Sequence, residues 1–196
     1  MKTRRDFVSN SSSSSFIVIT DAGRFLRIEG DLSERVVPDP EAGQAEFGWQ
    51  TEKYYDFWSK LNWCAIIAVD KRSAEEGESP EDRLREEVSK PWFRAEAMER
   101  LLVDVCAEIG VAVRLRTADE IAADEDYDYS CYIDHQSNIW ESPENARMFE
   151  TRKALYDFLA NDLSYIDNSN DNGGRDDEYD PETDSYPERP KDYYRP

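Results

Sequence analysis

Apolar and polar positions alternate in short blocks along the chain, and each block predicts one element of secondary structure. Phe16–Thr20 is an almost continuous apolar run, which predicts a first strand. The turn residues Asp21–Gly23 follow, and Arg24–Glu29 then alternates apolar and polar side chains, so the two segments predict an N-terminal hairpin. Trp63–Asp70 is apolar up to its last residue, which is typical of a central strand covered on both faces.

Other segments carry the spacing of amphipathic helices. Thr51 is a suitable cap for a helix over Glu52–Leu61. Ser79–Asp82 combines a cap, a proline and two acids, which favours a second helix that Pro91 divides. After the proline, one stripe of apolar residues predicts a further helix that ends at Gly110. The stripe consists of Met98, Leu101, Leu102, Val105 and Ile109.

The rest of the chain up to residue 167 predicts further loops, strands and helices. Two charged segments are predicted as solvated loops or edges, and they are Lys71–Glu78 and Asp119–Asp128. The predicted strands are Val111–Arg116, Tyr129–Ile133 and Ser164–Ile166. Helices are predicted to start at Ser142 and at Thr151. The second of them would bury Leu155, Phe158 and Leu159.

Together these elements predict an α+β or α/β fold, a single domain with a mixed sheet flanked by helices. This globular domain is expected to span residues 1–167. Residues 168–196 have almost no aliphatic side chains but many acids, tyrosines and prolines, so they are predicted to form a disordered acidic tail. The tail could bind a basic surface through its interleaved tyrosines and acids, or it could serve solubility alone.

Composition narrows the function classes. The chain has 24 Lys and Arg against 44 Asp and Glu, a net charge of −20, which disfavours nucleic acids and anionic membranes as ligands. The same charge favours a protein partner with a basic surface, or solubility alone. The longest apolar run is too short to span a bilayer and no signal peptide is evident, so a cytoplasmic location is expected. Three separated cysteines are therefore predicted to be reduced, buried thiols, and they are Cys64, Cys106 and Cys131.

The N-terminal stretch holds the most distinctive motif, a run of five serines over Ser11–Ser15. A serine run is usually a flexible linker, but this one lies between the apolar segments Phe7-Val8 and Phe16–Ile19, and we expect these anchors to order it. Serine hydroxyls donate and accept hydrogen bonds, so the loop could receive a phosphate or an acidic group of a partner. The residues expected to contact that group are Arg4, Arg5, Asn10, Ser11, Ser12, Ser13, Ser14 and Ser15.

The opening of the chain, Met1–Val18, resembles the N-terminus of a scattered set of uncharacterised bacterial and phage proteins through its Phe-Val-Ser-Asn, five serines and Phe. Some of those proteins also carry an Asp-His-Gln-Ser stretch and an Asn-Asp-Asn, which match Asp134–Ser137 and Asn170–Asn172 here. The resemblance covers three short segments of the chain. It implies a bacterial cytoplasm, or that of the host if the protein is encoded by a phage, and it implies no established activity.

The segment Asp134–Ser137 contains the single histidine of the chain and directly follows a predicted strand, where α/β folds often place their sites. Asp134, His135 and Ser137 are residue types of nucleophilic catalysis, and Gln136 could contact a ligand. Triads, however, are assembled from distant segments rather than from neighbours in the sequence. The alternative is a polar turn in which Asp134 bonds to the nearby backbone.

The spacing of oxygen-bearing side chains near residue 170 is similar to that of a calcium loop. The residues at its positions one, three, five and twelve are Asp167, Ser169, Asp171 and Glu178. Asn172 replaces the usual glycine, and Pro181 and Pro187 exclude a helix after the loop. Weak calcium binding is thus one reading and an Asn/Asp/Gly linker is the other, and no further cofactor is expected.

Two functions of different classes follow from these observations. The favoured one is a small acidic accessory protein that acts by protein–protein interaction, because the chain is strongly acidic and matches no catalytic signature. The alternative is an enzyme, a hydrolase or a nucleotide-processing protein, whose site joins the serine run, Asp134–Ser137 and Asn170–Asn172. Convergence of these three segments in one pocket favours the enzyme, whereas scattered positions favour the binding protein.

Overall fold

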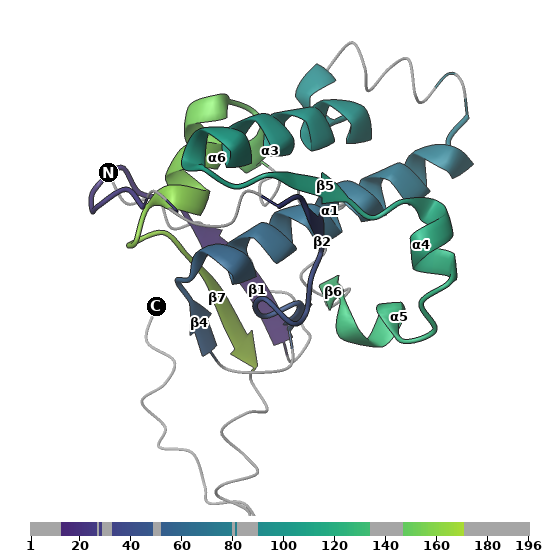
Figure 1. The fold of residues 1–196 in the computed structure, drawn as a ribbon, viewed down its shortest axis with the longest axis horizontal. Coiled ribbons are helices and arrows are strands. Elements are labelled where there is room, and N and C mark those ends of the chain that lie inside the picture. The colour runs from purple at the N-terminus through teal and green to yellow at the C-terminus, as the bar shows by residue number, and fades with distance from the viewer. Residues whose placement is uncertain are drawn as a thin grey trace, which may run out of the picture.

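The computed structural model describes residues 13–26, 28, 33–48, 52–79, 81, 90–133 and 147–170 (Figure 1). The α-helices are α1 (Phe57–Gly77), α3 (Ala95–Ile109), α4 (Ala118–Ala122), α5 (Tyr127–Ser130) and α6 (Arg152–Ala160). Two 3-10 helices are η1 (Pro91–Phe93) and η3 (Arg147–Phe149). The strands are β1 (Ser13–Val18), β2 (Arg35–Val37), β3 (Glu46–Phe47), β4 (Glu52–Tyr54), β5 (Val113–Leu115), β6 (Tyr132–Ile133) and β7 (Tyr165–Asn170).

The longest element, α1, runs through the middle of the fold as one helix. Asp56 caps it, because its carboxylate accepts a hydrogen bond from the backbone N–H of Ser59 at 2.8 Å. Three sequence-based predictions for this region are therefore wrong. They are the helix over Glu52–Leu61, the strand over Trp63–Asp70 and the loop over Lys71–Glu78.

The physical reason for the wrong strand prediction is the burial of α1 on all sides over Ser59–Val69. Every residue from Ser59 to Val69 is buried, so the run carries no polar stripe that would mark a helix. An uninterrupted apolar run is equally compatible with a buried strand. The residues assigned to the predicted helix start, Glu52–Tyr54, instead form β4 and pair with β7.

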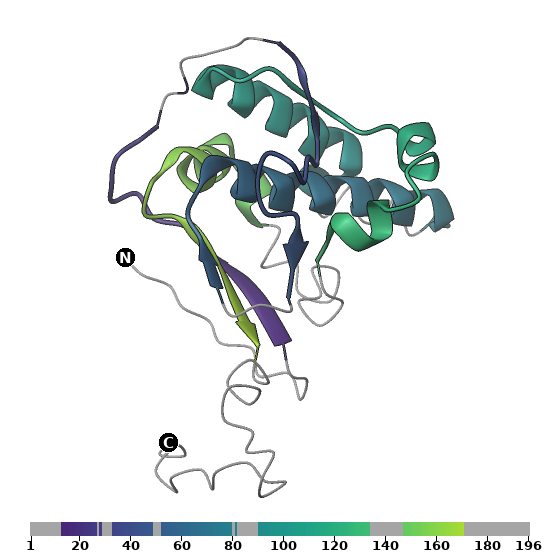
Figure 2. The same ribbon diagram turned by 60° about the horizontal axis from the view of Figure 1, so that its bottom comes forward.

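Helices occur together with both parallel and antiparallel strand pairs, and the predicted α+β class is confirmed. The described strands form three small sheets, with the orders β1-β7-β4, β2-β5 and β3-β6. β7 is central and antiparallel to both of its neighbours, whereas the two other pairs are parallel. Figure 2 shows the three-stranded sheet on one side of α1 and α3 on the other.

The partner of β1 comes from the far end of the described chain. The bend predicted at Asp21–Gly23 is present, but the ladder of β1 is formed with β7. The segment that follows the bend lies against the ends of two helices instead: the N–H of Leu26 donates to the carbonyl of Ala160 at 2.8 Å, and that of Ile28 to Ile109 at 3.1 Å.

One hydrophobic cluster joins α1, α3, α6 and the strands. The stripe predicted for α3 is confirmed, with Met98, Leu102, Val105 and Ile109 buried and Leu101 half-buried. Gly110 ends this helix with a φ of 103°, and a Cβ there would lie 2.6 Å from the carbonyl oxygen of Ile28. Thr151 caps α6 as predicted, since its hydroxyl accepts from the N–H of Ala154 at 3.1 Å. The buried side chains of α6 include the predicted Leu155, Phe158 and Leu159.

The acidic segment Asp119–Asp128 was predicted as a loop, and this is wrong for most of its length. Thr117 and Glu120 form a capping box that starts α4, and α5 follows. Because α5 takes Tyr127–Ser130, the strand predicted over Tyr129–Ile133 is reduced to β6. The strand predicted over Val111–Arg116 is confirmed as β5, and the strand predicted at Ser164 is confirmed as β7.

Several predictions lie outside the described residues and stay predictions. These are the helix after Ser79, the helix start at Ser142 and the part of the acidic tail beyond residue 170. The tail was predicted to begin at residue 168, and this is wrong, because Asn168–Asn170 form the end of β7 and pair with Ser13–Ser15. Cys64, Cys106 and Cys131 are buried free thiols, as predicted. Within the part of the chain that the structure describes, no helix combines the length and apolarity needed to cross a bilayer.

Since Ser13–Ser15 form the first half of β1, replacing all three by glycine should destabilise the fold. Glycine inside a strand costs about 0.5–1 kcal/mol per residue relative to alanine, so we expect the free energy of unfolding to fall by about 1–3 kcal/mol. Chemical denaturation of the full chain measures this change. The matched control replaces the same residues by threonine, which favours strands and should keep or raise stability. Equal denaturation midpoints for the two variants would show that the serine run is passive.

Candidate functional site

Part of the serine run lies beside the first residue of the Asn170–Asn172 motif. Ser13–Ser15 pair antiparallel with Asn168–Asn170, so that Ser13 lies opposite Asn170 and Ser15 opposite Asn168. Asn170 is the one residue of its motif within the described chain, so the ladder joins the two motifs at that residue. The prediction that the serine run is ordered is confirmed for Ser13–Ser15, which form this ladder.

The remaining predicted site residues are placed as follows. Asp167 and Ser169, the first two predicted calcium ligands, lie on β7, where Asp167 forms an ion pair with Lys53 at 3.1 Å. The other candidates lie outside the described residues, and they are Arg4, Arg5, Asn10, Ser11, Ser12, Asp134, His135, Gln136, Ser137, Asp171 and Glu178. Their roles as ligands, catalytic groups or metal ligands remain predictions.

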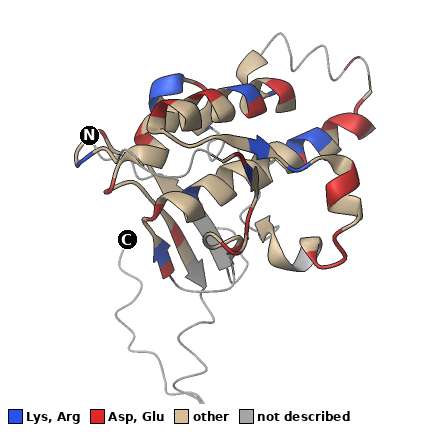
Figure 3. Ribbon diagram, in the orientation of Figure 1, with Lys and Arg blue, Asp and Glu red and all other residues tan. Residues whose placement is uncertain are grey.

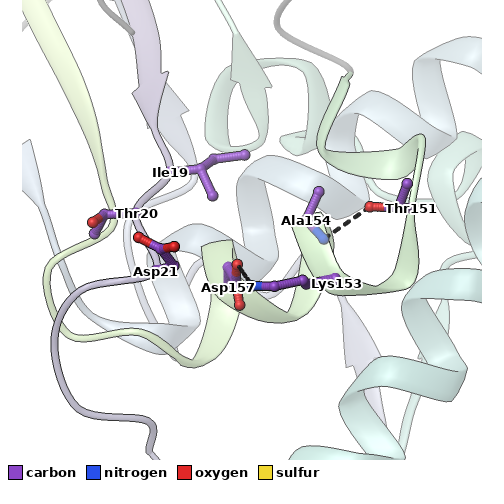
Figure 4. Close-up of a pocket in the computed structure, with 7 residues that line it drawn as sticks. All are labelled: Ile19, Thr20, Asp21, Thr151, Lys153, Ala154 and Asp157. Atoms are coloured by element: carbon purple, nitrogen blue, oxygen red, sulfur yellow. Dashed lines mark hydrogen bonds and ion pairs between the residues drawn. The ribbon is translucent and has the colours of Figure 1, made fainter. Parts of the chain in front are cut away.

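A groove of about 340 Å³ lies where the segment after β1 meets α6 (Figure 4). Its lining residues are Ile19, Thr20, Asp21, Thr151, Lys153, Ala154 and Asp157. The β1 segment and α6 therefore supply one wall each. Apolar groups from Ile19 and Ala154 lie beside polar groups from Asp21 and Asp157, so the groove can take a side chain with an apolar stem and a polar end.

The groove carries more negative than positive groups. Lys153 forms an ion pair with Asp157, whose side chain is almost buried, while the lysine side chain is 72% exposed. Hydrogen bonding to Asp157 raises the pKa of Lys153, and Asp21 contributes to the same shift through its charge. Two carboxylates thus face one ammonium group. The groove retains one uncompensated negative charge, which favours a cationic ligand group.

An apolar patch lies beside the groove and is built from the same two segments. Its members are Phe25, Tyr156 and Leu163. The exposed fractions of Phe25 and Leu163 are 47% and 50%. The ring of Phe25 lies 5.6 Å from that of Tyr156 on α6. Leu163 lies against Gly23, where a Cβ would approach its Cγ to 3.0 Å.

Hydrogen bonds between residues 20–26 and residues 160–164 hold the patch in place. We call these two paired segments the frame. The backbone N–H of Arg24 donates to the carboxylate of Asp162 at 2.9 Å, and the N–H of Asp162 donates to the carbonyl of Arg24 at 3.1 Å. The side-chain amide of Asn161 donates to the carbonyl of Thr20 at 2.9 Å. Gly23 has a φ of 114° within the frame, and any side chain there would meet Asn161 and Asp162.

Lys60 of α1 supports the frame from inside the protein. Its side chain is completely buried, and its Nζ donates to the carbonyls of Asn161 at 2.8 Å and Ser164 at 3.3 Å. Burial lowers the pKa of Lys60 to about 8, although the charge of Asp56 opposes this shift. The hydroxyl of Ser164 adds a hydrogen bond to the carbonyl of Asp157 at 2.8 Å. The start of β7, the end of α6 and α1 are therefore joined at one polar centre.

The opposite end of α1 has a different character. A second groove, of about 440 Å³, is lined by Val36, Arg116, Glu120, Ala123 and Asp124. Its charges are paired, because Arg116 binds Asp124, and Arg114 binds Glu120 at 2.6 Å. The hydrogen bonds from Arg114, and after them the backbone of Thr117, lower the pKa of Glu120 to about 2. Among the described residues that line this groove, pairing leaves no free cation to receive an anionic ligand.

Comparison with known proteins assigns no family to this arrangement. No protein-family model matches the chain, and no curated protein and no solved structure matches it. Among the residues that the structure describes, no three His, Cys, Asp or Glu side chains are close enough together to hold a metal ion.

Lys60, Asp157 and the apolar patch were not predicted as site residues. Lys60 lies between Ser59 and Asn62, ahead of the apolar run that starts at Trp63, so its burial had no local signal in the sequence. The spacing of Lys153 and Asp157, by contrast, predicts a pair on one face of a helix. The patch gave no comparable signal, since Phe25 and Leu163 are 138 residues apart in the sequence.

The buried amine of Lys60 predicts a specific dependence of stability on pH. Between about pH 8 and the ordinary lysine pKa of 10.5, the unfolded chain holds this proton and the folded chain does not, so stability rises with pH. Between about pH 7.5 and about pH 9.5, we expect the free energy of unfolding of the wild type to rise by about 1–2 kcal/mol more than that of Lys60→Met. Urea denaturation of both proteins measures the difference, in which the effect of the buried cysteines cancels.

Lys153→Met is the control for this experiment. The pKa of Lys153 is raised by Asp157, so its contribution is constant in this pH window and is lost only above it. A difference between wild type and Lys60→Met that stays flat over the window would contradict the buried, lowered pKa.

Proposed function

We propose that this protein acts by binding a protein partner that carries a basic surface. The observation that carries the proposal is the distribution of ion pairs. Most described basic side chains are paired with acids of the same chain, and they are Arg35, Lys53, Lys71, Arg72, Arg94, Arg114, Arg116, Arg152 and Lys153. The fold thus neutralises its positive charge internally. The acidic excess is left to face the solvent.

This excess gathers at one end of the molecule, which we call the acidic end. It comprises the C-terminal turn of α1, α4 and the connection from α4 to α5, coloured largely red in Figure 3. Glu76, Asp119, Glu125 and Asp126 are exposed there and form no ion pair with a described residue. Unpaired carboxylates on an exposed end attract a basic partner over about one Debye length, about 8 Å at physiological ionic strength.

The position of Glu76 supports a role in binding rather than in folding. Glu76 lies in the last turn of α1, where the partial negative charge of the helix end disfavours a carboxylate. Its neighbour Glu75 is compensated by Arg94, with an N–O distance of 3.0 Å. Since Glu76 forms no such pair within the described chain, its charge is available to a partner.

An enzymatic function, as a hydrolase or a nucleotide-processing protein, is the second candidate. The position of Ser13 opposite Asn170 supports it in part, because one residue from each of two predicted site segments lies in the same ladder. The third segment, Asp134–Ser137, follows β6 and lies outside the described residues. Loss of a hydrolytic activity in a His135→Ala variant that still binds its partner would favour this second function.

Binding and its salt dependence test the proposed function. Full-length protein on a support is exposed to bacterial lysate at about 0.01 M and about 1 M ionic strength, which shortens the Debye length from about 30 to about 3 Å. We expect basic proteins to be retained at low salt and released at high salt. A variant with Glu76→Gln, Asp119→Asn and Asp126→Asn should retain several-fold less of them.

The matched control removes the same number of charges away from the acidic end, with Glu41→Gln, Asp104→Asn and Glu150→Gln. It should bind like the wild type apart from the small loss of net charge. Equal retention by all three proteins, or retention that is unchanged by salt, would overturn the proposed function.

A Glu→Gln substitution at the C-terminal end of α1 and another at the N-terminal end of α3 should have opposite effects on stability. Glu76→Gln removes a carboxylate from the negative end of α1 and should raise the free energy of unfolding by about 0.3–0.5 kcal/mol. Glu96→Gln removes a carboxylate from the first turn of α3, where the helix dipole favours a negative charge. This substitution should lower the free energy of unfolding by a similar amount. Thermal denaturation at low salt measures both. A destabilised Glu76→Gln variant would assign Glu76 a structural role instead.

A further inference from the structure

We propose that the groove between the β1 segment and α6, together with the apolar patch beside it, is a second docking surface that binds a peptide segment with a cationic side chain next to bulky apolar ones. This inference goes beyond the proposed function, which concerns the acidic end. The elements that carry the two surfaces, α6 for the groove and α4 for the acidic end, lie at opposite ends of α1 (Figure 1). The charge of the groove and the exposure of the patch carry the inference independently of the acidic end.

The exposure of the patch is the first observation. Single exposed apolar side chains are normal, but neighbouring ones mark surfaces for binding. Of the four large apolar side chains that are exposed in the described chain, two belong to the patch, namely Phe25 and Leu163. Tyr156 extends it onto α6 through its contact with Phe25.

The rigidity of its support is the second observation. Phe25 lies in an exposed segment, yet the backbone of that segment is hydrogen-bonded to residues 160–162 on both sides of Phe25. Phe25 itself forms a β-bridge with Asn161. Lys60 fixes the carbonyls of the same loop from below. Side chains held in this way lose little conformational freedom when a ligand covers them, which favours binding.

The charge of the groove determines the kind of occupant. Asp21 and Asp157 face a single lysine, Lys153, and Asp162 adds a further carboxylate within the frame. An arginine or lysine of a ligand can lie along Ile19 and Ala154 with its charged end near Asp21 and Asp157. Its neighbouring apolar side chains then cover Phe25 and Leu163.

The net charge of the chain disfavours a second copy as the occupant. Each copy carries a net charge of −20, so two copies repel each other. A peptide segment of opposite charge gains Coulomb attraction as well as apolar burial. The occupant is therefore a segment of another protein in which Arg or Lys alternates with Leu, Ile or Phe.

Amide NMR of the uniformly ¹⁵N-labelled full chain tests the inference with three synthetic peptides of equal length. In the first, arginine alternates with leucine; in the second, arginine alternates with serine; in the third, glutamate alternates with leucine. We expect the first peptide to shift the amides of Asp21, Phe25, Tyr156 and Leu163. The other two should leave those amides unchanged, because each lacks one of the two required features.

Variants of the protein separate the surfaces. Phe25→Ser combined with Leu163→Ser should weaken the binding of the first peptide about tenfold. This corresponds to the loss of about 1.4 kcal/mol of binding free energy from apolar contact. The matched control is Tyr55→Ser, since Tyr55 is 44% exposed but pairs with Tyr165 outside the patch. Asp21→Asn should weaken binding by about threefold and reduce its salt dependence, and it tests the groove even if the double variant fails to fold.

The alternative outcomes distinguish this inference from the proposed function. Equal shifts with the arginine–leucine and arginine–serine peptides, or shifts confined to Glu76, Asp119 and Asp126, would overturn the docking surface and leave the acidic end in place. Shifts at the patch that persist when the acidic end is neutralised would support the docking surface alone. No shift with either arginine peptide would overturn both.

Discussion

The described fold depends most on a buried amine that has no carboxylate as a direct partner. Lys60 donates to the carbonyls of Asn161 and Ser164 from inside α1, with no accessible surface of its own. Taking a cation out of water is costly unless carbonyl dipoles replace the lost solvation, so the loop must keep both oxygens aimed at Nζ. The loop in turn determines where β7 begins and how residues 20–26 are held. One interaction thereby links the central helix, the three-stranded sheet and the exposed patch.

The two ends of α1 handle charge in opposite ways. At the acidic end, arginines such as Arg94 and Arg116 neutralise the carboxylates that the fold needs, and the remaining acids face solvent. At the other end, Lys153 neutralises only one of the two carboxylates in its groove, and apolar side chains lie beside it. Long-range attraction and short-range apolar contact are therefore separated along about 30 Å of helix. Such separation lets a basic partner be attracted by one end while a specific segment is recognised at the other.

Much of the fold could be predicted where local signals were complete. The stripe of α3 with Gly110, the cap Thr151 of α6 and the strand at Ser164 all carried their own start, period or stop, and each is present. The nature of α1 could not be predicted, because burial on every side removes the polar face that distinguishes a helix from a strand. For the site, the sequence indicated the serine run and Asn170, which the fold pairs. It could not indicate the patch, since only tertiary structure places Phe25 beside Asn161.

Amide hydrogen exchange of the full-length wild type and of Lys60→Met tests most directly whether the buried amine holds the frame. The amides that are hydrogen-bonded in the frame, those of Thr20, Arg24, Leu26 and Asp162, report its local opening. The account predicts that they exchange at least about tenfold faster in the variant, while amides in the middle of α3 change much less, because the frame opens without global unfolding. Acceleration of both groups by the same factor, or of neither, would contradict a local role for Lys60.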